Sequence, residues 1–334
     1  MKLLRILLFP LVPVYYVVTW VRNWLYDKGI FLSKSYDLPI ICVGNLSTGG
    51  TGKTPMIEYL ITKLKAERQL ATLSRGYKRK TTGFKIASEG DNALTLGDEP
   101  FQLYDKFKHE IIVSVDADRC HGIDQLLQLN DAPDVILLDD AFQHRKVEAD
   151  LYILLTAYDD LFSKDCVLPT GNLREPKSGM KRAHIIVITK CPDNLKKHDK
   201  DDIRQQLGIK PYQTLYFSRI AYAKHLYNED GEIPLNTIVD FTLVTGIAKP
   251  EPLVTYLKGK GFNFKHLKFA DHHEFSQQEL EALEQEAFIL TTEKDYVRLK
   301  AHQPLRSKLF YLPIRITIDA SEAFMAEVKN VMKH

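Results

Sequence analysis

The sequence predicts an α/β fold in which a doubly wound parallel sheet forms a larger domain and a second, smaller α/β domain follows it. Short apolar runs alternate with helical patterns, as is typical of strands that are buried on both faces. After residue 211 the pattern changes to aromatic and alternating residues, and a second series of strands and helices follows. The chain of 334 residues is long enough for two domains.

Strands and helices alternate in the larger domain. Leu38–Asn45 has the pattern of a buried strand, and residues 53–68 place apolar side chains on one face of a helix. Further buried strands are predicted near 111, 134, 151 and 184, in the runs I-I-V-S-V, D-V-I-L-L, L-Y-I-L-L and H-I-I-V-I-T. Because helical stretches lie before or between several of these runs, we expect the strands to be parallel.

The smaller domain is expected to follow a β-ribbon link. Its predicted elements are a strand in T-L-V-T-G, a helix after Pro252, a strand in F-N-F-K-H-L-K-F, a helix after Ser276, a strand in A-F-I-L-T-T and a last helix near the C-terminus. The expected domain boundaries are 1–28 for an N-terminal helix, 29–211 for the larger domain, 212–235 for the ribbon and 236–334 for the smaller domain.

Charge and cysteine content exclude some classes of protein. The chain has 45 Lys and Arg against 43 Asp and Glu, a formal net charge of +2, which gives no global reason to expect nucleic-acid binding. The four cysteines lack C-x-x-C spacing and indicate reduced thiols instead of a zinc site or a disulfide framework. No nucleic acid and no obligate protein partner is therefore expected.

The N-terminal segment is the most apolar part of the chain. Residues 6–21 form an uncharged run of 16 residues with two prolines. At about 1.5 Å per residue, such a helix is shorter than a hydrocarbon core of roughly 30 Å. Its tyrosines and tryptophans suit a membrane interface, and Arg5, Arg22 and Lys28 could meet lipid phosphates. We predict a helix on the membrane surface; the alternatives are a helix packed on the protein's own core and a true span.

The stretch V-G-N-L-S-T-G-G-T-G-K-T-P lies between the first predicted strand and the first predicted helix. Glycines there allow backbone N–H groups to converge on phosphates at the positive end of a helix, as in a P-loop NTPase-type sheet. Lys53 would reach the β- and γ-phosphates and Thr54 would bind magnesium. The residues expected to bind the nucleotide are Ser47, Thr48, Gly49, Gly50, Thr51, Gly52, Lys53 and Thr54. The alternative is a glycine-rich structural turn.

The phosphate loop departs from the standard pattern. Ser47 stands where G-x-x-x-x-G-K-[ST] requires glycine, and the loop resembles the G-G-x-G-K-T loop of partitioning ATPases and related kinases. Those ATPases usually carry a lysine just before the paired glycines, where this chain has Thr48. The difference argues against a dimeric switch ATPase.

Two pairs of acidic residues are candidate metal ligands or catalytic groups. Asp139 and Asp140 end a predicted buried strand, where carboxylates of parallel sheets face the ligand and can bind magnesium; a solvated turn is the alternative. Asp98 and Glu99 stand in L-G-D-E-P, and their spacing alone favours a helix N-cap at Asp98. Similarly, the histidines of D-H-H-E-F precede a capping box at Ser276, and such histidines are more often solvated than catalytic.

Seven motifs together resemble those of the tetraacyldisaccharide 4′-kinase family of lipid A biosynthesis, and they occur in the same order. They are V-G-N-L-S-T-G-G-T-G-K-T-P, L-S-R-G-Y, L-G-D-E-P, I-L-L-D-D-A-F-Q-H-R, L-P-T-G-N-L-R-E-P, F-A-D-H-H-E-F and T-T-E-K-D. The resemblance extends from the apolar N-terminus to about residue 300. It implies a membrane-associated phosphate-loop kinase that uses ATP and Mg²⁺, with a hinge ribbon between its domains. It also implies transfer of the γ-phosphate to the 4′-hydroxyl of a tetraacyldisaccharide 1-phosphate at the cytoplasmic face of the inner membrane, giving lipid IVA.

The resemblance also implies roles for individual residues. Asp98 would help to deprotonate the sugar hydroxyl, paired with His272 of the second domain, and Glu99 and Asp139 would act around magnesium. Chemistry does not separate His272 from His273, but the D-H pattern of the family favours His272. The implied catalytic residues are Asp98, His272, Lys53 and Arg174, and the implied metal ligands are Thr54, Glu99 and Asp139. For Arg174 the alternative is an ion pair with Glu175.

Other matching residues are expected on the substrate side of the site. Arg75 and Tyr77 lie in a basic loop, residues 75–80, that would approach the anionic lipid or its 1-phosphate; a solvated charge run is the alternative. Gln143, His144 and Arg145 would contact the substrate or support residues that do. Lys294 and Asp295 also match the family.

Two other classes of function compete with the kinase. A nucleotide-driven membrane switch shares the phosphate loop and a surface helix, but it does not need an Asp–His pair in a second domain. A nucleotide-binding scaffold without catalysis would tolerate the loss of Asp98 or Asp139, which are both present.

Overall fold

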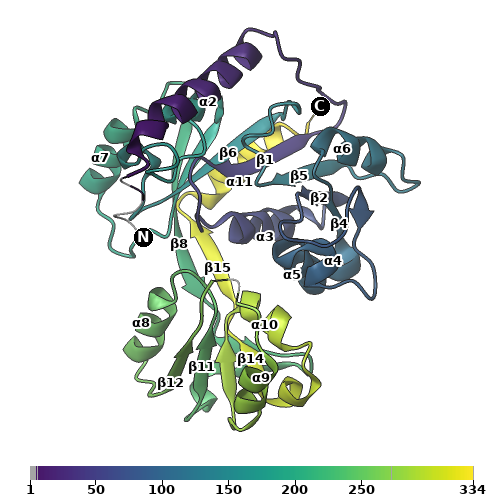
Figure 1. Cartoon of the computed structure of the whole chain (residues 1–334), viewed down its shortest axis with the longest axis vertical. Helices are drawn as coiled ribbons and strands as arrows, with labels where there is room; N and C mark the ends of the chain where they lie inside the picture. Colours follow the sequence, from purple (N-terminus) through teal and green to yellow (C-terminus); the bar gives the residue numbers. More distant parts are fainter. Residues whose placement is uncertain (1–4, 6, 272, 334) are drawn as a thin grey trace.

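The computed structural model describes residues 5, 7–271 and 273–333, so the predicted catalytic His272 lies outside the described residues. Within these ranges the strands form two sheets, one of nine strands and one of six (Figure 1). The predicted α/β class with a large, mostly parallel sheet is confirmed. All four cysteines belong to the described part of the chain and are free thiols, as expected.

The large sheet has the strand order β15-β8-β7-β6-β1-β5-β2-β4-β3. Neighbouring strands from β8 to β4 are parallel, whereas β15 and β3 are antiparallel additions at the two edges. The strands are β1 Ile40–Asn45, β2 Leu70–Ser74, β3 Lys85–Ile86, β4 Ile112–Val115, β5 Val135–Asp139, β6 Leu151–Ala157, β7 Ile185–Thr189, β8 Thr214–Tyr222 and β15 Ile314–Ile318. The predicted strands near 40, 111, 134, 151 and 184 are therefore confirmed.

Helices cover both faces of the large sheet, because successive side chains of a strand point to opposite faces. Ile41 and Val43 of β1 share a core with α3 Lys53–Leu64, α5 Asp98–Phe107 and α11 Ser321–Asn330. On the other face, α6 Arg119–Leu127 packs near β2 and α7 Lys197–Leu207 packs near β7 and β8. A short helix, α4 Ala93–Leu96, precedes α5.

The small sheet has the order β10-β9-β14-β13-β11-β12. Its strands are β9 His225–Tyr227, β10 Glu232–Pro234, β11 Thr242–Thr245, β12 Lys265–Lys268, β13 Ile289–Thr291 and β14 Leu309–Tyr311. Its helices are α8 Glu251–Gly259 on one face and α9 Gln277–Glu284 and α10 Glu293–Leu299 on the other. The predicted capping box is present, with Ser276 and Glu279 each bonding the other's backbone.

The C-terminal segment corrects one expectation. The last helix was expected in the smaller domain, but β15 pairs with β8 and α11 packs on the large sheet. Phe324 and Val328 of α11 are fully buried there. A local helical pattern does not tell which sheet will bury the apolar face, and here the open face of the large sheet does so.

The two sheets are joined by β8 and β15 (Figure 1). The first half of β8 pairs with β7, and its second half pairs with β15, which brings the chain back. The ribbon expected at 212–235 is thus divided, because β8 extends the large sheet while β9 and β10 form an antiparallel pair in the small one.

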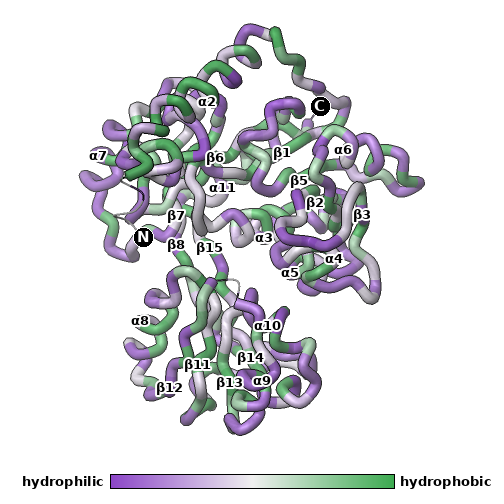
Figure 2. Tube along the Cα trace, in the orientation of Figure 1, coloured by the Kyte–Doolittle hydropathy of each residue, from purple (hydrophilic) through white to green (hydrophobic). Residues whose placement is uncertain are grey.

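The N-terminal helix α2 Val12–Asp27 follows a short 3₁₀ helix, η1 Phe9–Leu11, on the outside of the large sheet. Figure 2 shows that α2 is largely hydrophobic although it lies on the surface. Among the described residues of α2, Asn23 is the buried one, and Val12 and Tyr15 pack against the core. In the described ranges we find no helix with the length and apolarity to cross a membrane.

Charged side chains connect the units that carry the two sheets. Lys106 of α5 lies 2.6 Å from Glu58 of α3 and 2.8 Å from Glu293 of α10. Lys300, just after α10, pairs with Asp105 of α5. Glu58 is buried, and this burial together with the charge of Glu293 raises its pKa from 4.5 to about 7, although Lys106 opposes the shift.

The raised pKa of Glu58 predicts a pH-dependent stability. Between pH 4.5 and about 7 the folded chain keeps a proton that the unfolded chain releases, so the free energy of unfolding falls as pH rises through this range. Glu58→Gln cannot titrate. From pH 5 to pH 8 we expect the free energy of unfolding of the wild type to fall by about 1 to 3 kcal/mol relative to that of Glu58→Gln.

Urea unfolding at the two pH values measures this difference. Glu67→Gln, at an exposed position just beyond the same helix, is the matched control. A difference between Glu58→Gln and the wild type that stays constant with pH would contradict the assignment.

Candidate active site

The glycine-rich loop connects the C-terminal end of β1 to α3. Gly49 and Gly52 have φ angles of 126° and 89°, which residues with a Cβ rarely adopt. Gly52 is the N-cap of α3, so the helix begins at Lys53 with the free N–H groups of its first turn facing the loop. The positive end of the helix and these N–H groups can hold a phosphate group.

Side chains at the end of β7, which is separated from β1 by β6, hold the loop from outside. The Thr189 hydroxyl donates to the carbonyl oxygen of Thr51 at 2.7 Å, and the Lys190 ammonium donates to that of Gly50 at 2.5 Å. Both carbonyl oxygens are thereby turned toward the protein. Lys190 was not predicted as a residue of the site. The sequence does not tell that the end of β7 lies close to the phosphate loop, which follows from the strand order.

The segment that contains Arg174 runs beside the same loop. The N–H of Thr48 donates to the carbonyl oxygen of Asn172 at 2.7 Å, and the N–H of Arg174 donates to that of Leu46 at 2.7 Å. Of the residues expected to bind phosphate, Thr48 therefore has its backbone N–H occupied by this segment. The pairing fixes residue 174 directly beside the phosphate loop.

Arg174 and Lys53 converge on Asp140. The Arg174 guanidinium lies 2.6 and 3.1 Å from the two carboxylate oxygens of Asp140 and also contacts the side-chain oxygen of Asn45. Lys53 Nζ is 3.7 Å from Asp140. Burial opposes the charge of Asp140, but Lys53 and Arg174 prevail and lower its pKa. The alternative pairing of Arg174 with Glu175 is wrong.

Asp139 is the buried carboxylate of the pair, with 1% of its surface exposed. Burial, followed by the nearby charge of Glu99, raises its pKa to about 7. Its Oδ1 finds no hydrogen-bond partner within the described part of the chain. An unpartnered carboxylate oxygen next to a second carboxylate fits a divalent cation, which prefers oxygen ligands and would offset both charges. Thr54, the second residue of α3, lies in the adjoining turn.

A buried arginine that we did not predict contacts the end of β5, where Asp139 lies. Arg119, 2% exposed, donates to the carbonyl oxygen of Asp116 at 2.8 Å and lies 3.5 Å from that of Asp139. Burial lowers the pKa of Arg119 to about 10, although the charges of Asp139 and Asp140 oppose the shift. The motif D-A-D-R-C-H-G contains no signal for such a role.

Asp98 and Glu99 form the first turn of α5. The N-cap is Gly97, without a side-chain cap, so the N-cap alternative for Asp98 is wrong. Instead the Asp98 carboxylate pairs with the guanidinium of Arg298 on α10. Asp98 therefore lies where the two units meet, and the charge of Glu99 acts on Asp139.

The basic loop of residues 75–80 lies against the start of α5. A Cβ at Gly76, where φ is 67°, would lie 2.8 Å from the carbonyl oxygen of the residue before Gly97. One at Gly97, where φ is 94°, would lie 3.0 Å from the carbonyl oxygen of Tyr77. The two glycines bring the loop next to Asp98, with the Tyr77 side chain 66% exposed.

The residues after β5 contact other parts of the protein. Gln143 Nε2 donates to the carbonyl oxygen of Asn45 at 2.9 Å and to Glu175 at 3.0 Å. Arg145 donates to the carbonyl oxygen of Asn23 at 2.7 Å and pairs with Asp27, also at 2.7 Å. Of the two roles expected for Gln143 and Arg145, these contacts fit the supporting one, and contact with the substrate stays a prediction.

His144 lies between cationic groups. Burial, followed by Arg119, Arg75 and Arg22, lowers its pKa to about 4. The imidazole is consequently neutral at physiological pH. Arg75 itself is exposed at the end of β2.

The motif residues of the small unit that the structure describes contact other residues of the same unit. Asp295 is fully buried and accepts from the N–H of Gly246 at 2.9 Å, and Lys294 lies 3.5 Å from Asp271. His273 Nε2 is 2.9 Å from Glu279. The contact engages His273 with the capping box.

Phosphate loop, lysine, acidic pair and arginine thus meet at the C-terminal ends of β1 and β5, the ligand-binding edge of a parallel sheet. The fold and this site define an α/β protein with a nucleoside phosphate site of the kind that phosphotransferases use. The chain belongs to the tetraacyldisaccharide-1-P 4′-kinase family, whose sequence model matches residues 4–333.

Individual relatives agree with this membership. The tetraacyldisaccharide 4′-kinase of Flavobacterium johnsoniae is 53% identical and is matched over 100% of this chain and 98% of its own length. That of Bacteroides fragilis is 44% identical over 93% of this chain and 88% of its own. A crystal structure of LpxK from Aquifex aeolicus, described as an "apo" form in complex with ATP, superposes with a TM-score of 0.81 at 30% identity, covering 98% and 99% of the two chains.

Lys53→Ala tests the phosphate loop. Loss of the ammonium removes the cation that follows the glycines of the loop and leaves Asp140 with one fewer partner. We expect ATP binding to weaken about tenfold or more, measured by calorimetry with Mg²⁺ present. Lys63→Ala, at an exposed position of the same helix, is the control; equal affinities for the two variants would exclude Lys53 from the nucleotide site.

Proposed function

We propose that this chain transfers the γ-phosphate of ATP to the 4′-hydroxyl of a tetraacyldisaccharide 1-phosphate, a precursor of lipid A. The observation that carries the proposal is that Lys53 of the phosphate loop lies 3.7 Å from Asp140, while Glu99, the residue after Asp98, is close enough for its charge to raise the pKa of Asp139. Family membership and the likeness to a structure that contains ATP support the same reaction. Phosphoryl transfer needs a positioned hydroxyl, a base and cations around the phosphate, and each has a candidate here.

The larger unit acts as a P-loop kinase domain. Backbone N–H groups of the loop and the first turn of α3 would surround the phosphates, and Lys53 would neutralise their charge. Magnesium would be held by Thr54, Glu99 and Asp139, and it would offset negative charge on the transferring group. Arg174, beside Asp140, would stabilise charge that develops during transfer.

Asp98 is the proposed base. Its carboxylate would accept the proton of the sugar hydroxyl, and Arg298 of α10 keeps it oriented. His272, which lies outside the described residues, is proposed as its partner from the smaller unit. The β8/β15 pair would serve as a hinge, so that the base is assembled only when the units close and transfer to water is limited.

We also propose that α2 lies on the cytoplasmic face of the inner membrane, where the lipid substrate would be found. Its outward side carries large exposed apolar residues, which a soluble surface rarely gathers in one place. These are Val14, Val17, Val18, Trp20, Val21 and Trp24.

A transfer assay tests the reaction itself. Purified protein in detergent micelles would receive Mg²⁺, ATP labelled in the γ-phosphate and a tetraacyldisaccharide 1-phosphate. We expect label in the lipid and little free phosphate without it. Release of free phosphate independent of lipid, with none transferred, would favour the switch ATPase instead.

Asp98→Ala tests the base. We expect transfer to fall at least about 1,000-fold while ATP affinity stays within about twofold of the wild type, because Asp98 would act on the hydroxyl and not on the nucleotide. Asp105→Ala, which removes another ion pair between α5 and the small unit, is the control for lost interface contacts. Near-normal turnover of Asp98→Ala would refute the assignment.

Vesicle binding tests the surface role of α2. Val18→Ser with Trp20→Ser removes two apolar side chains that are 61% and 45% exposed. We expect co-sedimentation with phosphatidylglycerol-containing vesicles to weaken about tenfold or more. Val239→Ser, at a site 77% exposed in the small unit, should bind as the wild type does. Equal binding by all three proteins would place the membrane contact elsewhere.

A further inference from the structure

The attachment of α2 to the rest of the protein is mostly polar. The side that faces the large sheet carries Val12, Tyr15, Thr19, Asn23 and Tyr26, spaced three or four residues apart. A surface helix of a globular protein normally turns its apolar side inward. In α2 the apolar side faces outward, so hydrogen bonds must fix the position of the helix.

Two of these hydrogen bonds end on consecutive residues of the candidate site. The Tyr15 hydroxyl donates to the carbonyl oxygen of Arg174 at 2.8 Å, and Asn23 Nδ2 donates to the Glu175 carboxylate at 2.7 Å. The same two residues continue the segment that pairs with the phosphate loop. The helix thus contacts the backbone of Arg174 directly.

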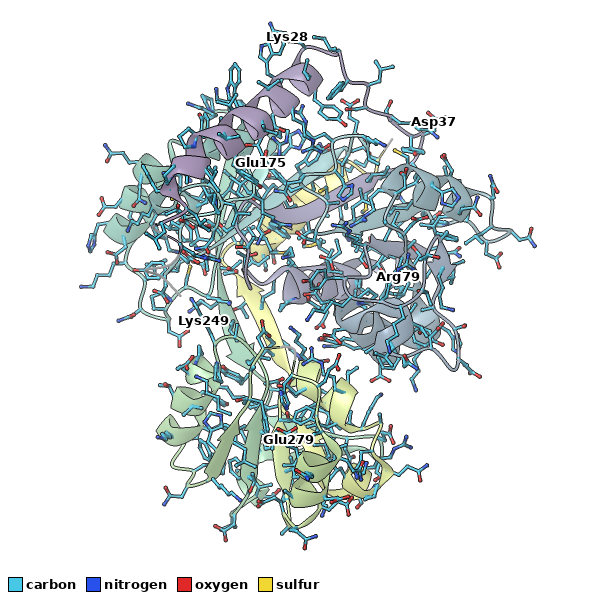
Figure 3. All side chains as sticks on the ribbon, viewed as in Figure 1. Lys28, Asp37, Arg79, Glu175, Lys249 and Glu279 are labelled. Carbon is cyan, nitrogen blue, oxygen red and sulfur yellow. The ribbon has the colours of Figure 1, made fainter. Side chains whose placement is uncertain are left out.

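Glu175 is the centre of this contact and lies beneath α2 in Figure 3. It is 2% exposed and is shared by Asn23, by Gln143 at 3.0 Å and by Arg182 at 2.7 Å. Burial of a carboxylate is costly unless hydrogen-bond partners of this kind satisfy it, so the positions of Glu175 and its partners are mutually fixed. Gln143 in turn donates to the carbonyl oxygen of Asn45, whose side chain receives Arg174.

We propose that α2 is a positioning element of the active site and that Tyr15 and Asn23 are its positioning residues. They hold the segment 174–175 so that the Arg174 guanidinium stays on Asp140, beside the phosphate loop. This inference rests on the proposed function of Arg174. It gives α2 two sides, one for the lipid surface and one for the catalytic arginine.

The alternative, that α2 is only an anchor, makes a different prediction. An anchor affects how much enzyme reaches lipid, which changes the KM for lipid or vesicle binding. A positioning element affects the chemical step, which changes kcat at saturating substrate. The two readings are therefore separable by kinetics.

Adjacent tyrosines provide a matched pair of variants. Tyr15→Phe deletes the hydroxyl that binds Arg174, whereas Tyr16→Phe deletes a hydroxyl from a side chain that is 45% exposed. In micelles, where attachment to a bilayer is not required, we expect Tyr15→Phe to lower kcat about three- to tenfold with both KM values within about twofold. Tyr16→Phe should match the wild type.

A double-mutant cycle tests the contact through Glu175. We expect Asn23→Ala and Glu175→Gln each to lower kcat about tenfold, and the double variant to lose less than the product of the two effects. Vesicle binding and the midpoint of thermal unfolding of Asn23→Ala should stay close to the wild type.

Three results would overturn the inference. They are equal kcat for Tyr15→Phe and Tyr16→Phe, effects of Asn23→Ala and Glu175→Gln that simply multiply, and an Asn23→Ala variant that changes only the KM for lipid or vesicle binding. Should Asn23→Ala fail to fold, the tyrosine pair still decides, because removing one hydroxyl leaves the packing intact. If the wild type transfers label while the tyrosine variants are equal, the proposed function stands and the inference fails.

Discussion

Two consecutive carboxylates at the end of β5 impose the constraint on which the rest of the site depends. Asp139 is buried and Asp140 is partly exposed beside it, and two like charges so close together can coexist only if cations lie near them. Lys53 comes from the loop after β1, Arg119 from α6 and Arg174 from the segment beside the loop. The left-handed conformation of Asp140, with φ of 50°, ends the alternation of the strand, and the charge of Lys53 lowers the pKa of Asp140 and opposes the rise at Asp139. The strand order and the positions of the loop and helices therefore bring these three cationic side chains close to the two carboxylates.

Pairs of opposite charges also connect the small unit to the large one. The small unit meets α5 through ion pairs, with Arg298 on Asp98 and Lys106 shared between Glu58 and Glu293. Charged contacts of this kind gain little in water and depend strongly on geometry, unlike an apolar interface. The interface between α5 and the small unit is therefore set mainly by charged side chains. Because Asp98 is one of its members, the position of the proposed base depends on how the units meet.

How much the sequence could predict follows from the range of each interaction. The strands, α3 and the loop around Lys53 were predictable, since apolar periodicity and glycine spacing are local signals. The return of β15 and α11 to the large sheet was not, and neither was the contact of Asp98 with Arg298, which lies 200 residues away. Arg119 and Asn45 were missed for a related reason. Their roles arise where separate strand ends meet, and no spacing within one motif encodes that meeting.

The inverted amphipathicity of α2 follows from the same reasoning. Its inward side buries little apolar surface, so the hydrophobic effect contributes little to holding it. Hydrogen bonds are directional, and those of Tyr15 and Asn23 fix the rotation of the helix about its axis as well as its place. A rotation that would bury the apolar side would break the contacts of Glu175, which is nearly inaccessible to water. The outward direction of the apolar residues is thus set by the residues that hold the segment 174–175, so the proposed surface binding and the geometry of the site depend on one helix.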